Sequence, residues 1–237
     1  NFSNKHKNFK VPKLYYAGAI KGDFGGPYVK IKKLEKFFPE NKSHFNIVYI
    51  LSNSPNLSLR TINLIKKKRI PLILNQNGVF YPSWYRGNWK KQNLNMANVY
   101  HSADYILWQS SFCKKASEKF LGKSFSQGEI IYNAVDTKKF FPKINHSSRK
   151  FKLLITGNIS ANSSYRIKIV LQALKEILKV NNNVHLYIAG FIEDLNTFLS
   201  QVENLKIAEY VTFLGSFNQI NAEKIYQMAD AYITMSY

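Results

Sequence analysis

The chain has 237 residues, of which 45% are hydrophobic and 15% aromatic, so it is long and apolar enough to bury a core and falls outside the intrinsically disordered class. Lysine and arginine number 34 against 14 acidic residues, a formal net charge of +20. This charge indicates either a general composition bias, since the lysines are spread along the whole chain, or attraction to phosphate-bearing or anionic-lipid partners. The longest apolar runs fall far short of the roughly 18 residues of a spanning helix, and the first residues are polar, so we expect neither a transmembrane helix nor a signal peptide.

Short apolar runs alternate with amphipathic segments along the first part of the chain. We expect strands at residues 13–19, 46–52, 70–76, 104–110 and 128–133, and helices at residues 28–38, 54–69, 89–103 and 111–122. For the second helix we expect Ser54 as the N-cap and Pro55 at the first position, and we expect Gly122 to end the fourth.

Residues 140–152 break this rhythm, because they are polar, contain Pro142 and have no apolar period, as in an interdomain linker. The alternation then resumes, with strands expected at 151–157, 183–190, 210–216 and 230–236 and helices at 164–179, 193–207 and 221–229. Strands that alternate with helices predict parallel sheets covered by helices on both faces. We therefore predict an α/β chain with two Rossmann-like domains, 1–143 and 151–237, joined by a linker at 144–150.

Parallel sheets of this kind bind ligands beyond the carboxyl ends of their strands. The candidate loops are residues 18–26, 75–78, 133–136, 157–160, 190–193 and 215–217. Gly25 and Gly26 stand between a strand and a helix, where glycine lets the backbone approach a phosphate. They match neither G-x-G-x-x-G nor a P-loop, so a plain tight turn is the alternative. The glycines of "TGNIS" and "FLGSF" have a similar alternative, which is that they simply end strands.

Three further features have both a functional and a structural interpretation. Arg166, at the start of a long helix, could pair with phosphate oxygens or could be a solvated surface side chain. Asn77 in "NQNG" could hydrogen-bond a sugar hydroxyl, or the segment could be an Asn-Gly turn. In residues 79–89, Trp84, Tyr85 and Trp89 could form a stacking platform for a sugar, or a lid packed on its own domain.

The chain contains no familiar metal or hydrolase pattern. Its five histidines and one cysteine, Cys113, form no zinc motif, and neither G-x-S-x-G nor H-E-x-x-H occurs. The lone cysteine excludes an internal disulfide and fits a reducing compartment. His101 has no partner at metal-ligand spacing, so we interpret it as a structural or surface residue.

The segment "EIIYNAVDTKKFFP", residues 129–142, resembles the N-x-V-D-x-x-x-F-x-P segment of family 4 type glycosyltransferases, which have the GT-B fold. Three other stretches are similar to segments of that family in the same order: "GGPYVKIKKL", "ADYILWQSSFCKK" and "VTFLGSF…IYQMADAYITMS". Together the four stretches extend over nearly the whole chain.

The resemblance implies hexosyl transfer from a nucleotide-sugar donor to an acceptor, with retention at the anomeric carbon and no essential metal or other cofactor. It implies acceptor binding by the first domain and donor binding by the second. Carried over, Gly25 and Gly26 would meet the diphosphate, and the backbone of the loop 215–217 would meet the base. Residues implied on the donor side are Gly157, Asn158, Gly215, Ser216 and Phe217, with Arg166 as the candidate that balances the charge of the leaving nucleotide.

The chain also departs from the family pattern. The family usually has Gly-Arg after the first strand of the donor domain, and here Asn158 follows Gly157. Asn77 stands where many members place a histidine, so Asn77 is the candidate for the catalytic contact on the acceptor side. The acidic E-x(7)-E segment that binds the donor sugar does not occur, so we expect the donor domain to be truncated and the fragment to be inactive.

We expect the partners to be a nucleotide-sugar and a saccharide or lipid-linked acceptor of cell-surface polysaccharide or lipopolysaccharide assembly. The localisation we expect is cytoplasmic, with peripheral attachment to an anionic membrane on its inner face. One alternative is a nucleotide-dependent oxidoreductase or epimerase, against which the missing G-x-G-x-x-G argues. Another is a non-catalytic module that binds sugar or nucleic acid, and scattered lysines argue against nucleic acid.

Overall fold

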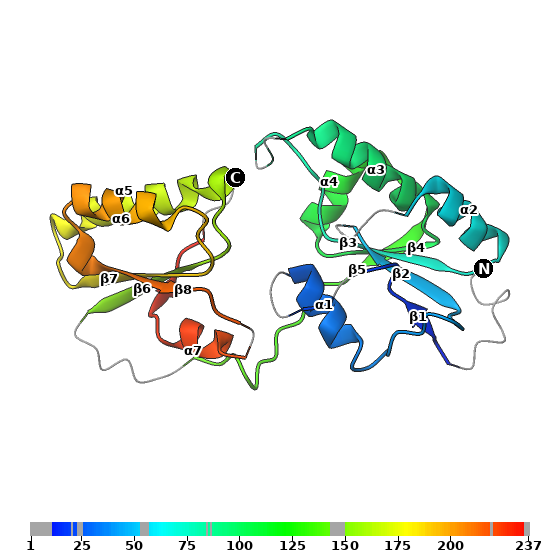
Figure 1. Ribbon diagram of the computed structural model, residues 1–237, viewed down its shortest axis with the longest axis horizontal. Coiled ribbons are helices and arrows are strands. Elements are labelled where there is room, and N and C mark those ends of the chain that lie inside the picture. Colours follow the sequence, from blue (N-terminus) through cyan, green and yellow to red (C-terminus); the bar gives the residue numbers. More distant parts are fainter. Residues whose placement is uncertain are drawn as a thin grey trace. The chain divides into compact units, whose positions relative to one another are not determined.

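The computed structural model describes residues 11–19, 21–22, 26–52, 57–83, 85, 87–142, 150–218 and 220–234. The chain forms two compact units, Asn1–Ala134 and Val135–Tyr237. Each unit contains one sheet of parallel strands with helices on both faces (Figure 1). This confirms the predicted α/β class with two Rossmann-like units.

The first unit has a five-stranded sheet in which each strand pairs in parallel with its neighbour along the chain. Its strands are β1 (Leu14–Tyr15), β2 (Ile47–Leu51), β3 (Leu72–Gln76), β4 (Tyr105–Trp108) and β5 (Gln127–Ile130). Its helices are α1 (Gly26–Leu34), α2 (Leu59–Lys67), α3 (Trp89–Ser102) and α4 (Ser111–Leu121). Strand β1 is shorter than predicted because the chain turns just after it, with positive φ at Ala17 and Gly18.

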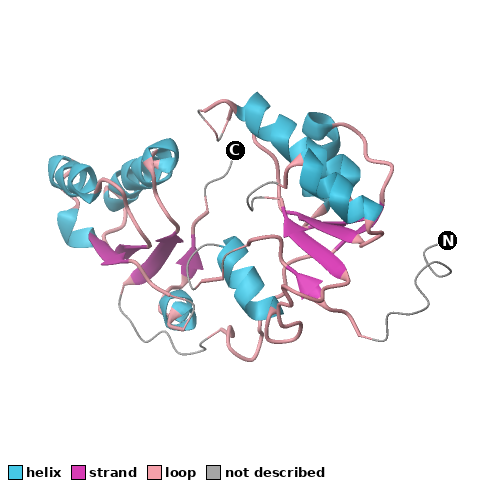
Figure 2. Ribbon diagram, turned by 45° about the vertical axis from the view of Figure 1, so that its right-hand side comes forward, coloured by secondary structure: helices cyan, strands magenta, loops and turns pink. Residues whose placement is uncertain are grey.

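The alternation of side chains along β2 divides the first unit into two cores. Val48 and Ile50 join one buried cluster with residues of α2, α3 and α4, whereas Tyr49 and Leu51 join a second cluster with Ile31 of α1. Figures 1 and 2 agree with this division, since α1 lies on one face of the sheet and the other three helices lie on the opposite face. Burial on both faces explains why β2 is apolar throughout, and each such side chain contributes roughly 1.5–3 kcal/mol.

Serine caps start two helices of the first unit. The Ser58 hydroxyl accepts the backbone N–H of Thr61 at the start of α2, so the predicted cap at Ser54 is wrong, and Ser54 and Pro55 lie outside the described residues. The helix begins at Leu59 because Ser58 satisfies one of its free N–H groups. Helix α4 starts at the Ser110 cap and ends as predicted at Gly122, whose φ of +92° suits glycine.

The second unit has a four-stranded parallel sheet in the order β8-β7-β6-β9. Its strands are β6 (Phe151–Thr156), β7 (Val184–Ala189), β8 (Val211–Gly215) and β9 (Ala231–Tyr232). Its helices are α5 (Tyr165–Leu178), α6 (Leu195–Asn204) and α7 (Ala222–Gln227), with short 3-10 turns η1 (Ala161–Ser163) and η2 (Ala208–Tyr210). Helices α5 and α6 cover one face of this sheet and α7 lies on the other (Figures 1 and 2).

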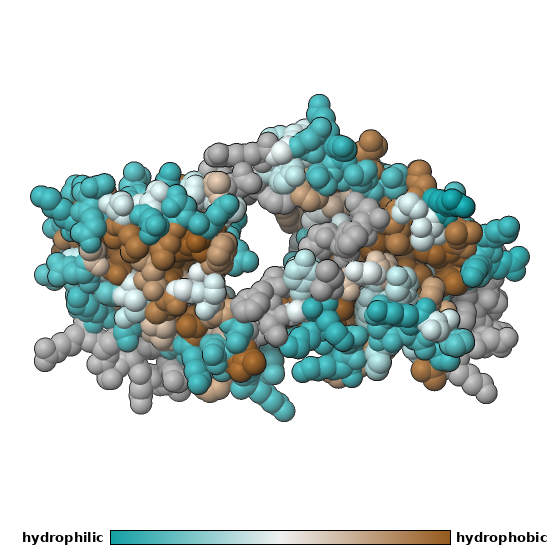
Figure 3. Space-filling model, viewed as in Figure 1, coloured by the Kyte–Doolittle hydropathy of each residue, from teal (hydrophilic) through white to brown (hydrophobic). Residues whose placement is uncertain are grey.

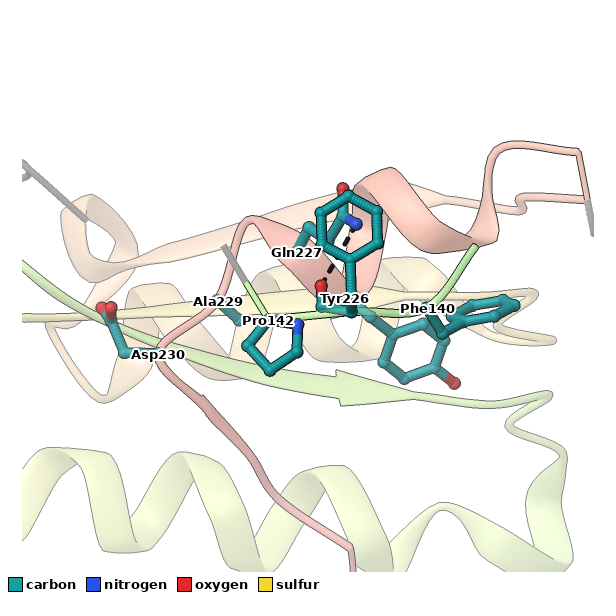
Figure 4. A pocket seen from close by; sticks show the side chains of 7 residues that line it. Phe140, Pro142, Tyr226, Gln227, Ala229 and Asp230 are labelled. Atoms are coloured by element: carbon teal, nitrogen blue, oxygen red, sulfur yellow. Dashed lines mark hydrogen bonds between the residues drawn. The ribbon is translucent and has the colours of Figure 1, made fainter. Parts of the chain in front are cut away.

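The residues just after Val135 pack on the second unit. The ring of Phe140 lies edge-on to Tyr226 of α7, with centroids 6.2 Å apart, and the Gln227 amide donates to the Phe141 carbonyl oxygen over 3.3 Å (Figure 4). The same four residues line part of a cavity of about 300 Å³. These contacts explain why the compact units divide between Ala134 and Val135, which is earlier than the predicted boundary at 143. Most of the predicted linker, 144–149, lies outside the described residues.

Candidate functional site

Three glycines lie side by side at the carboxyl edge of the second sheet. Gly157, Gly190 and Gly215 come at the ends of β6, β7 and β8, and each has positive φ. The Gly190 N–H donates to the Gly215 carbonyl oxygen over 2.7 Å, and the Gly157 N–H donates to the Ala189 carbonyl oxygen over 3.0 Å. The edge is therefore lined by backbone rather than by side chains, which leaves room for a ligand to approach.

The order of strands makes this edge a switch point. The chain moves from β6 to β7 and β8 in one direction and then returns to β9 on the other side of β6. Ligands of open parallel sheets bind at such a point, beyond the carboxyl ends of the two strands that flank it. Gly157 and Asn158 follow β6 there, and Asn158 is exposed. The structure thus brings both predicted residues to the expected edge.

Three hydroxyl groups cluster at the carboxyl ends of β6 and β9. The Thr156 hydroxyl lies 3.0 Å from the Tyr226 hydroxyl and 3.2 Å from the Tyr232 hydroxyl. The Phe217 ring, which follows β8, lies edge-on to Tyr226 with centroids 6.5 Å apart. Sequence reasoning missed Thr156, Tyr226 and Tyr232, because 70 or more residues separate Thr156 from its partners.

The predicted base-binding loop 215–217 is open. Gly215 and Ser216 are exposed, and Phe217 is half-buried. Gly215 has φ +71°, and no atom lies within 4 Å of the position its β-carbon would take. Glycine is therefore required here for its backbone conformation rather than for close packing.

The loop after β6 is tied to the loop after β7 by a carboxylate. The Ala161 N–H, at the start of η1, donates to Glu193 Oε2 over 3.0 Å, and the Glu193 N–H donates to the Ile159 carbonyl oxygen over 2.9 Å. One N–H at the start of a helix, a group that commonly receives phosphate, is thus already satisfied by the protein's own carboxylate.

Arg166 lies in the first turn of α5 and is half-buried. Its Nε donates to the hydroxyl of Tyr165 over 3.3 Å, and its guanidinium lies 5.9 Å from the centre of that ring. The side chain is therefore positioned by its neighbour rather than extended into solvent, which favours a role in binding.

In the first unit, the loop after β3 brings polar groups together. The Lys30 ammonium donates to Asn75 Oδ1 over 3.0 Å and to Asn77 Oδ1 over 3.3 Å. The Asn77 N–H donates to the Ser52 hydroxyl, at the end of β2, over 2.9 Å. Asn77 is thus held at the carboxyl edge, as predicted, and the Asn-Gly segment is not merely a surface turn. Sequence reasoning missed Lys30, which the packing of α1 brings to this edge.

Burial affects the titration of this cluster. It lowers the pKa of Lys30, an effect that the nearby Cys113 sulfur partly offsets. Burial likewise raises the pKa of the Cys113 thiol, which donates to the Gln76 carbonyl oxygen over 3.1 Å. A hydrogen bond to Asn75 partly counteracts the rise that burial causes in the pKa of Tyr49. Lys30 lies on α1, Tyr49 within β2, Asn75 near the end of β3 and Cys113 in the first turn of α4.

Two other predicted features of the first unit are the glycine loop before α1 and the aromatic stretch before α3. Gly25 lies outside the described residues, and Gly26 begins α1 with open space around its β-carbon position. The predicted aromatic platform packs on its own unit: Trp89 lies edge-on to Phe120 of α4, and Tyr85 lies edge-on to Phe80. Those contacts favour the structural alternative for Trp89 and Tyr85, and Trp84 lies outside the described residues.

Among the described residues, no three His, Cys, Asp or Glu side chains come together as a metal site requires. The His101 Nε2 lies 2.7 Å from the Leu121 carbonyl oxygen, which supports its structural interpretation. In the described part of the chain, no helix has the length and apolar character needed to cross a bilayer.

Residues 136–237 match the family described as "Glycosyl transferases group 1", a stretch that includes all four strands of the second sheet. No curated protein matches the chain in sequence.

Several solved structures have a similar fold. Anabaena HepE in complex with UDP and glucose is 15% identical, with a TM-score of 0.62 over 81% of this chain and 53% of that one. Sucrose-phosphate synthase from Thermosynechococcus elongatus is 12% identical, with a TM-score of 0.61 over 85% of this chain and 52% of that one. A glycosyltransferase from Rickettsia africae is 16% identical, with a TM-score of 0.61 over 90% of this chain and 63% of that one.

The chain spans about half the length of the first two structures. At these identities the likeness shows the fold alone, and it confirms the predicted GT-B type with two parallel-sheet units. Residues 136–237 thus match the glycosyl transferases group 1 family model, and the chain has a fold of the GT-B type.

Proposed function

We propose that the chain serves a glycosyltransferase that moves a hexose from a nucleotide-sugar to a saccharide or lipid-linked acceptor. The observation that carries the proposal is the family match of residues 136–237, which coincides with a parallel sheet whose carboxyl edge carries three glycines. Gly157 lies at the switch point beside β6, and Gly190 and Gly215 follow the neighbouring strands β7 and β8. A backbone-lined edge next to a helix start suits a nucleotide diphosphate.

The donor site would use the residues of the second unit in separate roles. Gly157 and Asn158 would lie against the diphosphate, and the backbone of the loop 215–217 would hold the base. Arg166, held against Tyr165, would balance the negative charge that builds on the departing diphosphate. Fixed positive groups stabilise such a transition state more than they stabilise the bound substrate.

The donor nucleotide is proposed from neighbouring structures. HepE was solved with UDP and glucose, and a pneumococcal O-GlcNAc transferase, GtfA, was solved with UDP and GlcNAc. We therefore take UDP as the first probe for this chain. We further propose retention at the anomeric carbon and no requirement for a metal ion, so a chelator should leave nucleotide binding unchanged.

The acceptor would belong to cell-surface polysaccharide or lipopolysaccharide assembly, with Asn77 as its catalytic contact. The first unit holds 22 basic and 6 acidic residues, a net charge of +16, whereas the second unit has 12 basic and 8 acidic residues, a net charge of +4. This imbalance supports peripheral docking of the first unit on an anionic cytoplasmic membrane surface. Co-sedimentation with anionic vesicles at low salt tests the docking, and the absence of binding would contradict it.

Saturation-transfer NMR with UDP tests the core of the proposal, because it detects weak binding of a ligand that exchanges rapidly. We expect signal on the uracil and ribose protons of UDP and none on NADH, the probe for the oxidoreductase alternative. Transfer to NADH but not to UDP would overturn the proposal. A salt-dependent shift of an oligonucleotide, without UDP binding, would instead favour the nucleic-acid module.

A further inference from the structure

The Lys30 ammonium lies in an unusual position for a lysine. Helix α1 directs it to the carboxyl end of β3, where it is half-buried and donates to the amide oxygens of Asn75 and Asn77. Most lysines of this chain lie in solvent, as does Lys33 on the same helix. Lys30 is therefore oriented by tertiary contacts on a sheet edge where ligands of this fold class bind.

Among the described residues of the first unit, no acidic side chain neutralises the charge of Lys30. An ammonium has three N–H donors, and two of them are given to neutral amide oxygens. No carboxylate lies within ion-pair distance of it among the residues that the structure describes. A partly buried cation without a counter-charge is unfavourable, and the lowered pKa reports the same cost. An anion that accepted the third N–H would offset this energetic cost.

The neighbouring groups make the position rigid and reachable. Asn75 is buried and interacts with Tyr49, and the Asn77 backbone is fixed by the buried Ser52 hydroxyl. Lys30 and Asn77 themselves are only half-buried. The surface where α1 lies is largely hydrophilic in the view of Figure 3.

We propose that Lys30, held by Asn75 and Asn77, binds an anionic oxygen group of the acceptor, a carboxylate or a phosphate on its sugar. The inference rests on the proposed function, which gives acceptor binding to the first unit. It narrows the acceptor to an acidic saccharide or a sugar phosphate, and it makes Lys30 a residue that determines specificity. The net charge of +16 on the first unit fits such an acceptor, since it attracts anions at long range.

The test is saturation-transfer NMR on the full chain with three probes: glucuronate, glucose 6-phosphate and uncharged glucose. We expect both anions to bind more tightly than glucose does. Lys30→Met should weaken the binding of both anions by about tenfold, the value of one charged hydrogen bond. Lys33 is an exposed lysine on the same helix, so Lys33→Met should leave the binding of both anions unchanged. Lys30→Arg should retain part of that binding.

A second measurement guards against misfolding of Lys30→Met. In the unchanged chain, adding glucuronate should shift the ε-ammonium NMR signal of Lys30 and leave the signal of Lys33 in place. Equal binding of glucose and glucuronate, or equal effects of Lys30→Met and Lys33→Met, would overturn the proposal.

The same variants identify the source of the anion and separate this inference from the proposed function. If Lys30→Met weakens the binding of UDP and not that of glucuronate, the anion is the donor diphosphate, and the assignment to the acceptor is wrong. If the unchanged chain binds glucuronate through Lys30 but shows no contact with UDP, the anion site stands and the nucleotide-sugar function fails.

Discussion

The backbone of Gly157 occupies the space that a side chain at Gly190 would need. A β-carbon built on Gly190 would overlap the carbonyl oxygen of Gly157, and Gly190 also has a φ of +134°. Because the obstacle is backbone, it cannot rotate away as a side chain could. The close approach holds the starts of the loops after β6 and β7 together at the proposed donor edge.

This contact predicts a large effect of Gly190→Ala. We expect it to lower the free energy of unfolding by about 3 kcal/mol or more, because strain and overlap add. Gly215→Ala is the matched control, since it has positive φ but open space, and it should cost about 1–2 kcal/mol. Urea denaturation measures both, and equal costs would show that the Gly157 contact is unimportant.

The stacked Arg166 predicts a specific loss of nucleotide binding. Arg166→Ala should weaken UDP binding by about tenfold or more, because a charged hydrogen bond to the diphosphate is lost. Lys175→Ala, an exposed lysine in the last turn of the same helix, should change it little. Titration by calorimetry compares the two, and a similar small effect of both would remove Arg166 from the donor site.

The carboxylate of Glu193 predicts the opposite effect. Glu193→Gln can still accept the Ala161 N–H but removes a negative charge from the start of η1. If phosphate binds near this turn, UDP affinity should rise roughly two- to fivefold, the usual size of a charge effect at a helix start. The same calorimetric titration measures the rise, and unchanged affinity would mean that the diphosphate binds elsewhere.

Tyr16 predicts how stability depends on alkaline pH. Its phenol donates to the Phe38 carbonyl oxygen over 2.8 Å, and burial, with Glu35 and Glu40 nearby, raises its pKa from 10.0 to about 12. The folded chain keeps this proton in a range where the unfolded chain releases it. The contribution to stability is therefore full below pH 10 and is lost as the pH rises towards 12.

Replacing the phenol checks this dependence. The fall in unfolding free energy between pH 10 and 12 should be shallower in Tyr16→Phe than in the unchanged chain. Tyr15→Phe, at the neighbouring position, serves as the control. An identical slope in Tyr16→Phe and the unchanged chain would show that another group causes the alkaline loss.

Much of the architecture could be predicted from local patterns. Every strand and helix that the sequence predicts forms in the described residues. The spacing of apolar residues and the glycines between elements are local properties, so the sequence alone reveals them. The ends were less predictable: the start of α2 depends on whether Ser54 or Ser58 caps the helix, and both are plausible caps in sequence. The aromatic stretch was ambiguous for a related reason, since its role depends on Phe120, which lies on another helix.

The sequence by itself determined the fold class, the glycines after the strands of the second sheet and the placement of Asn77 and Arg166 near carboxyl edges. It could do so because the apolar periodicity and the succession of strands and helices along the chain are local properties. Only the tertiary structure decided which side chains meet. The Lys30 ammonium reaches Asn75, 45 positions away, because α1 packs on the face of the sheet that carries Tyr49 and Leu51. The Gly157–Gly190 contact likewise depends on how β6 and β7 pair, which no local pattern specifies.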